Sequence, residues 1–124
     1  MAGLPAQMDM EKRSSNCVIL HIKGRLYMAT VPEVESRFQT LLPICSRKKV
    51  VLNLSETIYV SSDGWRFFLN ASHQVSDRGG HFLLAGMKEE VLDAFEILEF
   101  SGILRHFPSL SDALKANPSL PSRS

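Results

Sequence analysis

Residues 60–65 read Val-Ser-Ser-Asp-Gly-Trp and join an apolar run to an amphipathic stretch. Ser61 is placed to cap a helix, because its side-chain oxygen would accept a hydrogen bond from a backbone N–H group of the first turn. Asp63 would put negative charge where the helix dipole favours it. Gly64 costs about 0.5 to 1 kcal/mol of helix stability relative to alanine. We infer that the backbone is closely approached at Gly64.

A hydroxyl at such a position could also be a nucleophile, but the surroundings of Ser62 do not favour this. A hydrolase elbow would place glycine two positions before Ser62, and Val60 stands there. No His and Asp pair downstream has a reason to converge on Ser62. The sequence has no glycine-rich loop for phosphates or dinucleotides. A small serine hydrolase is therefore the least favoured interpretation, and we expect no enzyme activity and no cofactor.

Metal chemistry is not indicated either. The four histidines do not form a close pair at the spacings that metal ligation uses; they are His21, His73, His81 and His106. We expect no metal site.

The elements that must position these residues alternate between strands and helices. Three short apolar runs predict buried strands, at residues 17–22, 49–54 and 81–85. Gly24 is expected to end the first run in a turn. Residues 8–12 predict an edge strand that pairs with 17–22 through a turn at 14–16. Helical segments between apolar strands are typical of βαβ units, so the predicted fold class is α/β.

Four segments predict helices. The first opens at Thr30, because Thr30 and Glu33 form a capping-box pattern. The second follows Ser61 and ends at Gly79. The last two are expected over residues 91–98 and after Ser109 or Ser111.

Length and composition suit one intracellular domain. The chain has 124 residues, 44 % of them apolar, and a formal net charge of +1, which gives no global field for nucleic acid or an anionic membrane. We expect one domain over residues 1–116 and a flexible tail at 117–124. We expect no signal peptide, and no apolar run approaches the roughly 20 residues that span a bilayer. Cys17 and Cys45 have apolar neighbours, as expected of buried thiols in a reducing, cytoplasmic compartment.

Three short motifs carry a resemblance to a known family; they read Gly24-Arg25-Leu26, Val51-Leu52-Asn53-Leu54 and Ser61-Ser62-Asp63-Gly64. In this order they resemble the STAS domains, in particular the bacterial anti-sigma factor antagonists. Residues 80–85 and 91–102 resemble the family's fourth strand and third helix, so the resemblance covers nearly the whole chain. It implies the SpoIIAA-like fold, a four- to five-stranded mixed, mainly parallel sheet with about four helices.

The resemblance also implies a function in transcription regulation. The serine that the family's kinase phosphorylates falls on Ser62. The implied partner is an anti-sigma factor with a histidine-kinase-like ATPase fold, which would bind ATP, phosphorylate Ser62 and so be released. A phosphate would bring about 1.5 to 2 negative charges to the contact. Nucleic acid and direct membrane insertion are not expected.

The chain departs from the family's pattern at three positions. Ser61 replaces the leading aspartate of the motif, Asp63 replaces its second serine, and Arg25 replaces an acidic residue of the early turn. Ser61 is therefore an alternative phosphorylation site. The altered motif also keeps open a non-phosphorylated STAS subunit of a sensory scaffold or a transport complex.

We expect a partner to contact the turn before the second helix and the exposed face of that helix. Phe67 lies off the apolar stripe and is predicted to be an exposed aromatic residue. Trp65 shares the stripe with Phe68, which favours packing against the sheet over a binding role. The expected contact residues are Ser61, Ser62, Asp63, Gly64, Trp65, Phe67 and, from the turn before the first helix, Met28.

Overall fold

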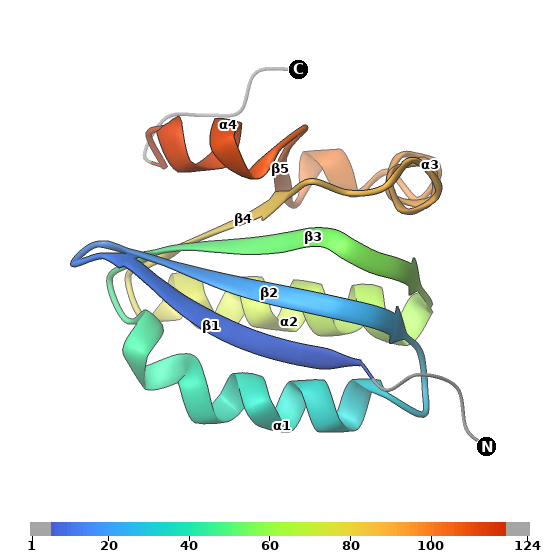
Figure 1. The fold of residues 1–124 in the computed structure, drawn as a ribbon, viewed down its shortest axis with the longest axis horizontal. Coiled ribbons are helices and arrows are strands. Elements are labelled where there is room, and N and C mark those ends of the chain that lie inside the picture. Colours follow the sequence, from blue (N-terminus) through green and yellow to red (C-terminus); the bar gives the residue numbers. More distant parts are fainter. Residues whose placement is uncertain (1–5, 119–124) are drawn as a thin grey trace.

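Five strands form one sheet in the order β1-β2-β3-β4-β5 in the computed structural model, which describes residues 6–118 (Figure 1). Their bounds are β1 Gln7–Ser14, β2 Cys17–Leu26, β3 Lys49–Val60, β4 His81–Ala85 and β5 Arg105–Phe107. The hairpin of β1 and β2 is antiparallel, and all other neighbouring strands are parallel. The predicted α/β class with a mixed, mainly parallel sheet is confirmed.

The helices divide between the two sides of the sheet. They are α1 Val31–Leu41, α2 Ser62–Asp77, α3 Glu89–Ile97 and α4 Leu110–Lys115, with short 3-10 turns η1 Leu42–Cys45 and η2 Phe100–Gly102. Helices α1 and α2 lie side by side under one face (Figure 1), and α3 shares their core cluster through Val91 and Phe95. Helix α4 packs on the opposite face.

The central strands are buried on both faces, which explains why they read as near-continuous apolar runs. Leu20, Leu52 and Leu84 face Phe38 of α1 and Phe68 of α2 in the larger core cluster, and each is at most 1 % exposed. A smaller cluster on the opposite face joins β3 and β4 to α4; its buried members are Val51, Leu83, Ala85 and Ala113.

Strands β2 and β3 extend well beyond the predicted runs, to Leu26 and Val60. The expectation that Gly24 ends the strand is wrong: Gly24 lies inside β2 with φ of 97°, beside a shift in the β2–β3 register. Thr57 is fully buried in the extended part of β3, and its hydroxyl donates a hydrogen bond of 2.9 Å to the carbonyl of Ile22. The Thr57 side chain thus stabilises a stretch where the backbone pairing between β2 and β3 is irregular.

The capping box predicted at Thr30 is wrong, although α1 begins at the next residue. The Thr30 hydroxyl donates to the carbonyl of Arg25 at 2.6 Å and accepts from the N–H of Tyr27 at 3.1 Å. It therefore closes the turn between β2 and α1 instead of capping the helix. In contrast, α4 is capped by Ser109, one of the two serines predicted to begin it, which accepts from the N–H of Asp112 at 3.1 Å.

Both cysteines are free, with Cys45 buried and Cys17 half-buried. Burial raises the pKa of each thiol, which keeps both in the neutral form.

Within residues 6–118 no helix is both long and apolar enough to cross a membrane. Most of the tail predicted at 117–124 lies outside the described residues, from 119 onward.

Replacing Thr57 with valine should lower the free energy of unfolding by about 1–3 kcal/mol, because the Ile22 carbonyl would lose its donor in a dry environment. Urea unfolding followed by circular dichroism measures this. Thr40→Val is a matched control on the exposed side of α1, where we expect a change within about 0.5 kcal/mol. Equal losses in the two variants would contradict the assigned role of Thr57.

Candidate functional site

The turn from β3 into α2 is pinned to the neighbouring strand through Ser61. The N–H of Ser61 donates to the carbonyl of Leu26, the last residue of β2, at 2.8 Å. Its side-chain oxygen accepts from the N–H of Gly64 at 3.4 Å, and its backbone is extended. Ser61 is therefore the N-cap of α2, as predicted, and its hydroxyl is engaged in the fold.

Ser62 is the first residue of α2 and, unlike Ser61, it is exposed. Its hydroxyl makes no hydrogen bond to any other described residue. The next residue, Asp63, forms an ion pair of 3.1 Å with Arg66 one turn further along the exposed side of the helix. An available hydroxyl thus lies at a positive helix end, beside one carboxylate and one guanidinium.

The sequence predicted that another group closely approaches the backbone at Gly64. The structure shows this approach, and the groups belong to Val60 and Leu26 of the same chain. A Cβ atom at this position would lie 2.7 Å from Cγ1 of Val60 and 3.1 Å from Cβ of Leu26. Real Cβ atoms do not approach other atoms this closely, so a side chain here would push α2 away from the ends of β2 and β3. Gly64 is buried and fixes where α2 begins.

Trp65 and Phe67 both point into the molecule, with 2 % and 3 % of their surfaces exposed. The predicted exposure of Phe67 is therefore wrong. Helix α2 packs against α1 as well as against the sheet, and the ring of Phe67 meets that of Phe38 edge-on at 5.7 Å. Trp65 is buried, as expected of a packing role, and its ring also packs against Phe95 of α3, with ring centroids 5.8 Å apart.

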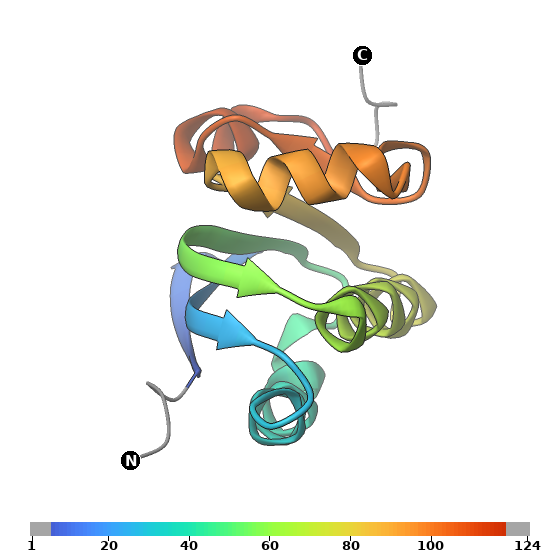
Figure 2. The ribbon, with the colours of Figure 1, turned by 90° about the vertical axis from the view of Figure 1, so that its right-hand side faces the viewer.

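The exposed surface beside Ser62 comes from neighbouring loop and strand ends. Because Leu26 is paired with Val60, the β2–α1 loop and the β3–α2 turn leave the same end of the sheet, which Figure 2 faces. Met28 in that loop is 76 % exposed, in keeping with its place among the predicted contact residues. Ile58 and Tyr59 at the end of β3 are also exposed and were not predicted.

A polar network lies apart from this turn, on β1, β2 and β3. The side-chain amide of Asn53 donates to Nδ1 of His21 at 3.0 Å, and Nε2 of His21 lies 2.9 Å from Oε1 of Glu11. The bond from His21, with help from Arg13, lowers the pKa of Glu11 below its usual value. This gives Asn53 of the Val-Leu-Asn-Leu motif a structural role.

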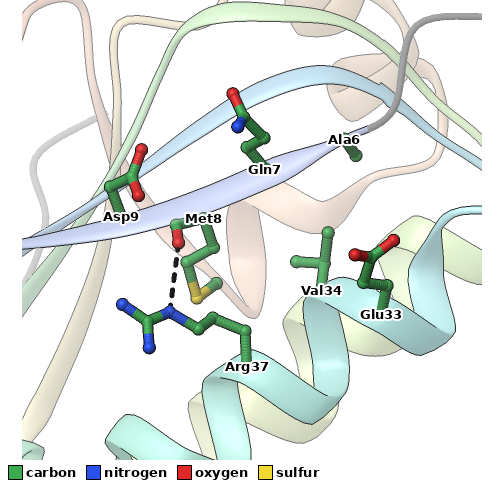
Figure 3. Close-up of a pocket in the computed structure, with 7 residues that line it drawn as sticks. All are labelled: Ala6, Gln7, Met8, Asp9, Glu33, Val34 and Arg37. Carbon is green, nitrogen blue, oxygen red and sulfur yellow. Dashed lines mark hydrogen bonds between the residues drawn. The ribbon is translucent and has the colours of Figure 1, made fainter.

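Other sites for chemistry are not evident in the described part of the chain. No histidine hydrogen-bonds to Ser61 or Ser62, and no group of three or more metal-ligating side chains gathers within residues 6–118. A groove of about 170 Å³ runs between the edge strand β1 and α1 (Figure 3). Its lining carries both signs of charge, and Nε of Arg37 donates to the carbonyl of Met8 at 3.4 Å. Arg37 thus satisfies one backbone carbonyl of the edge strand β1.

The two serines should differ in what their removal does to stability. Ser61→Ala should lower the free energy of unfolding by about 1 kcal/mol, because the N-cap acceptor is lost. Ser62→Ala should leave it within about 0.5 kcal/mol, because the hydroxyl of Ser62 is exposed and unbonded. Urea unfolding of both variants tests this, and a larger loss in Ser62→Ala would contradict the assignment of the cap.

Several solved structures share this fold. An anti-sigma factor antagonist from Mycobacterium paratuberculosis is 18 % identical with a TM-score of 0.80, over 91 % of this chain and 94 % of that one. The Bacillus cell fate determinant SpoIIAA, in its phosphorylated form, is 13 % identical with a TM-score of 0.64, over 87 % and 96 %. The murine anion transporter Slc26a9 is 16 % identical with a TM-score of 0.69, over 83 % of this chain and 18 % of the transporter.

These likenesses confirm the predicted SpoIIAA-like fold. No curated protein matches the chain. The family model of the STAS domain matches residues 7–113, from the first residue of β1 into α4. The protein therefore belongs to the STAS domain family.

Proposed function

We propose that this STAS domain is an anti-sigma factor antagonist, a regulatory binding protein that is released from its partner when Ser62 is phosphorylated. The observation that carries the proposal is that two adjacent serines differ in whether their hydroxyls are used by the fold. Ser61 uses its hydroxyl to cap α2, whereas Ser62 presents a free hydroxyl at the surface. Ser62 is therefore the preferred phosphorylation site, and the alternative at Ser61 would cost the helix its cap.

A phosphate on Ser62 would change the surface and leave the fold in place. The N-terminus of a helix stabilises phosphate through its free N–H groups and its dipole. Asp63 repels a neighbouring phosphate, while Arg66, four residues after Ser62, lies on the same side of the helix and is a cation within reach. The added charge would act against a partner that must desolvate this turn to bind.

The contact surface follows from exposure at this end of the sheet. Ser62, Asp63 and Met28 are accessible to a partner. Gly64, Trp65 and Phe67 are buried, so in this proposal they set the position of the turn and do not touch the partner. This revises the contact set expected from the sequence.

The proposed partner is an anti-sigma factor of the histidine-kinase-like ATPase fold, which supplies the ATP. Support comes from SpoIIAA, an anti-sigma factor antagonist whose structure is solved in both unphosphorylated and phosphorylated forms. Under this proposal the chain is a cytoplasmic bacterial phosphoprotein without catalytic activity of its own. The likeness to an anion transporter supports a second candidate, a non-phosphorylated STAS subunit of a transport complex.

Mass spectrometry of the protein from its own cells tests the modification. We expect phosphate on Ser62, in an amount that changes between growth and stress, and none on Ser61. Ser62 unmodified in every condition would contradict phosphorylation and favour the transport or scaffold candidate.

Partner release is tested by cross-linking in cells from a photoreactive residue at position 28. Ser62→Asp should reduce capture of an anti-sigma factor by tenfold or more, roughly 1.4 kcal/mol of binding free energy. Ser36→Asp adds the same charge at an exposed position of α1 and should leave capture unchanged. Equal capture by the two variants would rule out a charge switch at Ser62.

A further inference from the structure

A second surface of the molecule gathers exposed apolar side chains around α3. Six large apolar residues are exposed within residues 6–118, and five of them belong to α3, to the segment after it or to the strand end beside it. They are Ile58 and Tyr59 at the end of β3, Ile97 and Leu98 at the end of α3, and Ile103 after η2. We call these five residues the α3 surface. Clusters of this kind are typical of interaction sites.

Packing of the core does not require this exposure. Helix α3 is held by Val91 and Phe95, which are 3 % and 0 % exposed and belong to the main core cluster. Ile97 and Ile103 are 78 % and 63 % exposed, so they add little to that cluster. Their apolar character is thus unexplained by the isolated fold.

A cleft of about 90 Å³ lies between the end of β3 and α3, at one end of the α3 surface. It is lined by Ile58, Tyr59 and Val60 of β3 and by Glu90, Val91 and Ala94 of α3. Glu90, Ala94 and Ile97 stand at helical positions i, i+4 and i+7, so one face of α3 leads from the cleft to Ile97. The volume is far below the roughly 300 Å³ of the smallest ligand pockets. A cleft of this size suits one side chain of a protein partner.

The charges on α3 and the segment after it are all negative, although Lys88 precedes the helix and Arg25 is paired with Tyr59 across the sheet. Five carboxylates and no lysine or arginine occur between residues 89 and 104; the carboxylates belong to Glu89, Glu90, Asp93, Glu96 and Glu99. None of the five takes part in a salt bridge with a described residue, the four salt bridges found all lying elsewhere. An uncompensated acidic rim attracts a cationic partner and repels an anionic one.

We propose that the α3 surface binds a cationic amphipathic helix of another protein. The helix would place one apolar side chain in the cleft beside Tyr59, another against Ile97, and its lysines or arginines opposite the acidic rim. The same rim opposes an anionic membrane and nucleic acid. It also opposes a second copy of this chain, because two acidic rims would face each other. This binding needs no phosphate on Ser62, but it borders the proposed switch, because Ile58 and Tyr59 also belong to the exposed surface beside Ser62.

A model peptide tests the proposal directly. The probe is a 14-residue peptide of leucine and lysine with leucine at positions i, i+3, i+4 and i+7, titrated into the ¹⁵N-labelled protein. We expect amide shift changes to concentrate at residues 58–60 and 90–103, and the affinity to fall as salt rises. Ile97→Ser should weaken binding roughly tenfold. Met28→Ser is the matched control, since Met28 is equally exposed but lies in the β2–α1 loop.

The peptide with glutamate in place of lysine should not bind. Shift changes located elsewhere, or equal binding by Ile97→Ser and Met28→Ser, would overturn the proposal. Two further measurements address other occupants of the surface. If the protein floats with phosphatidylglycerol vesicles and Ile97→Ser abolishes this, the occupant is a membrane and not a partner helix. If the protein self-associates in sedimentation and Ile97→Ser abolishes this, the occupant is a second copy of the chain.

Discussion

The geometry of the candidate site depends on the close packing of Gly64 against Leu26 and Val60. Because residue 64 has no side chain, the start of α2 lies directly against the ends of β2 and β3, where a Cβ would come within 2.7 Å of Val60. The hydrogen bond from the Ser61 N–H to the Leu26 carbonyl ties the same three elements together. The position of Ser62 at the start of α2 thus follows from this packing and this hydrogen bond, neither of which involves the Ser62 side chain, so a change in its charge can leave the underlying structure intact.

Much of the fold was predictable from residue patterns, because buried parallel strands leave a strong signal. Residues 81–85 were predicted as a strand and form β4. The extension of β3 from Ser55 to Val60 was not predicted, since its inward-facing position is Thr57 and a buried hydroxyl reads as a polar residue. The prediction for Thr30 also failed because of a hydroxyl. Thr30 and Glu33 fit a capping box, but the Thr30 hydroxyl forms its hydrogen bonds within the turn before α1 and not with the helix.

The site was predictable in its local chemistry and less so in its surface. The cap at Ser61 and the tight packing at Gly64 both follow from rules that act within a few residues. Phe67 was wrongly assigned to the surface because helical periodicity identifies one apolar face, whereas α2 packs against both the sheet and α1. The exposure of Ile58 and Tyr59 follows a shift in the β2–β3 register, a feature that no local pattern reveals.

Trp65 is the single tryptophan of the chain. Its indole Nε1 is buried without a hydrogen-bond partner among the described residues, and its ring lies 5.3 Å from that of Phe100 and 5.8 Å from that of Phe95. An indole held away from water emits at shorter wavelength than a solvated one, and its emission changes when the neighbouring rings move. The protein therefore carries a built-in optical probe one helical turn from Ser62, which reports on the docking of α3 without an added label.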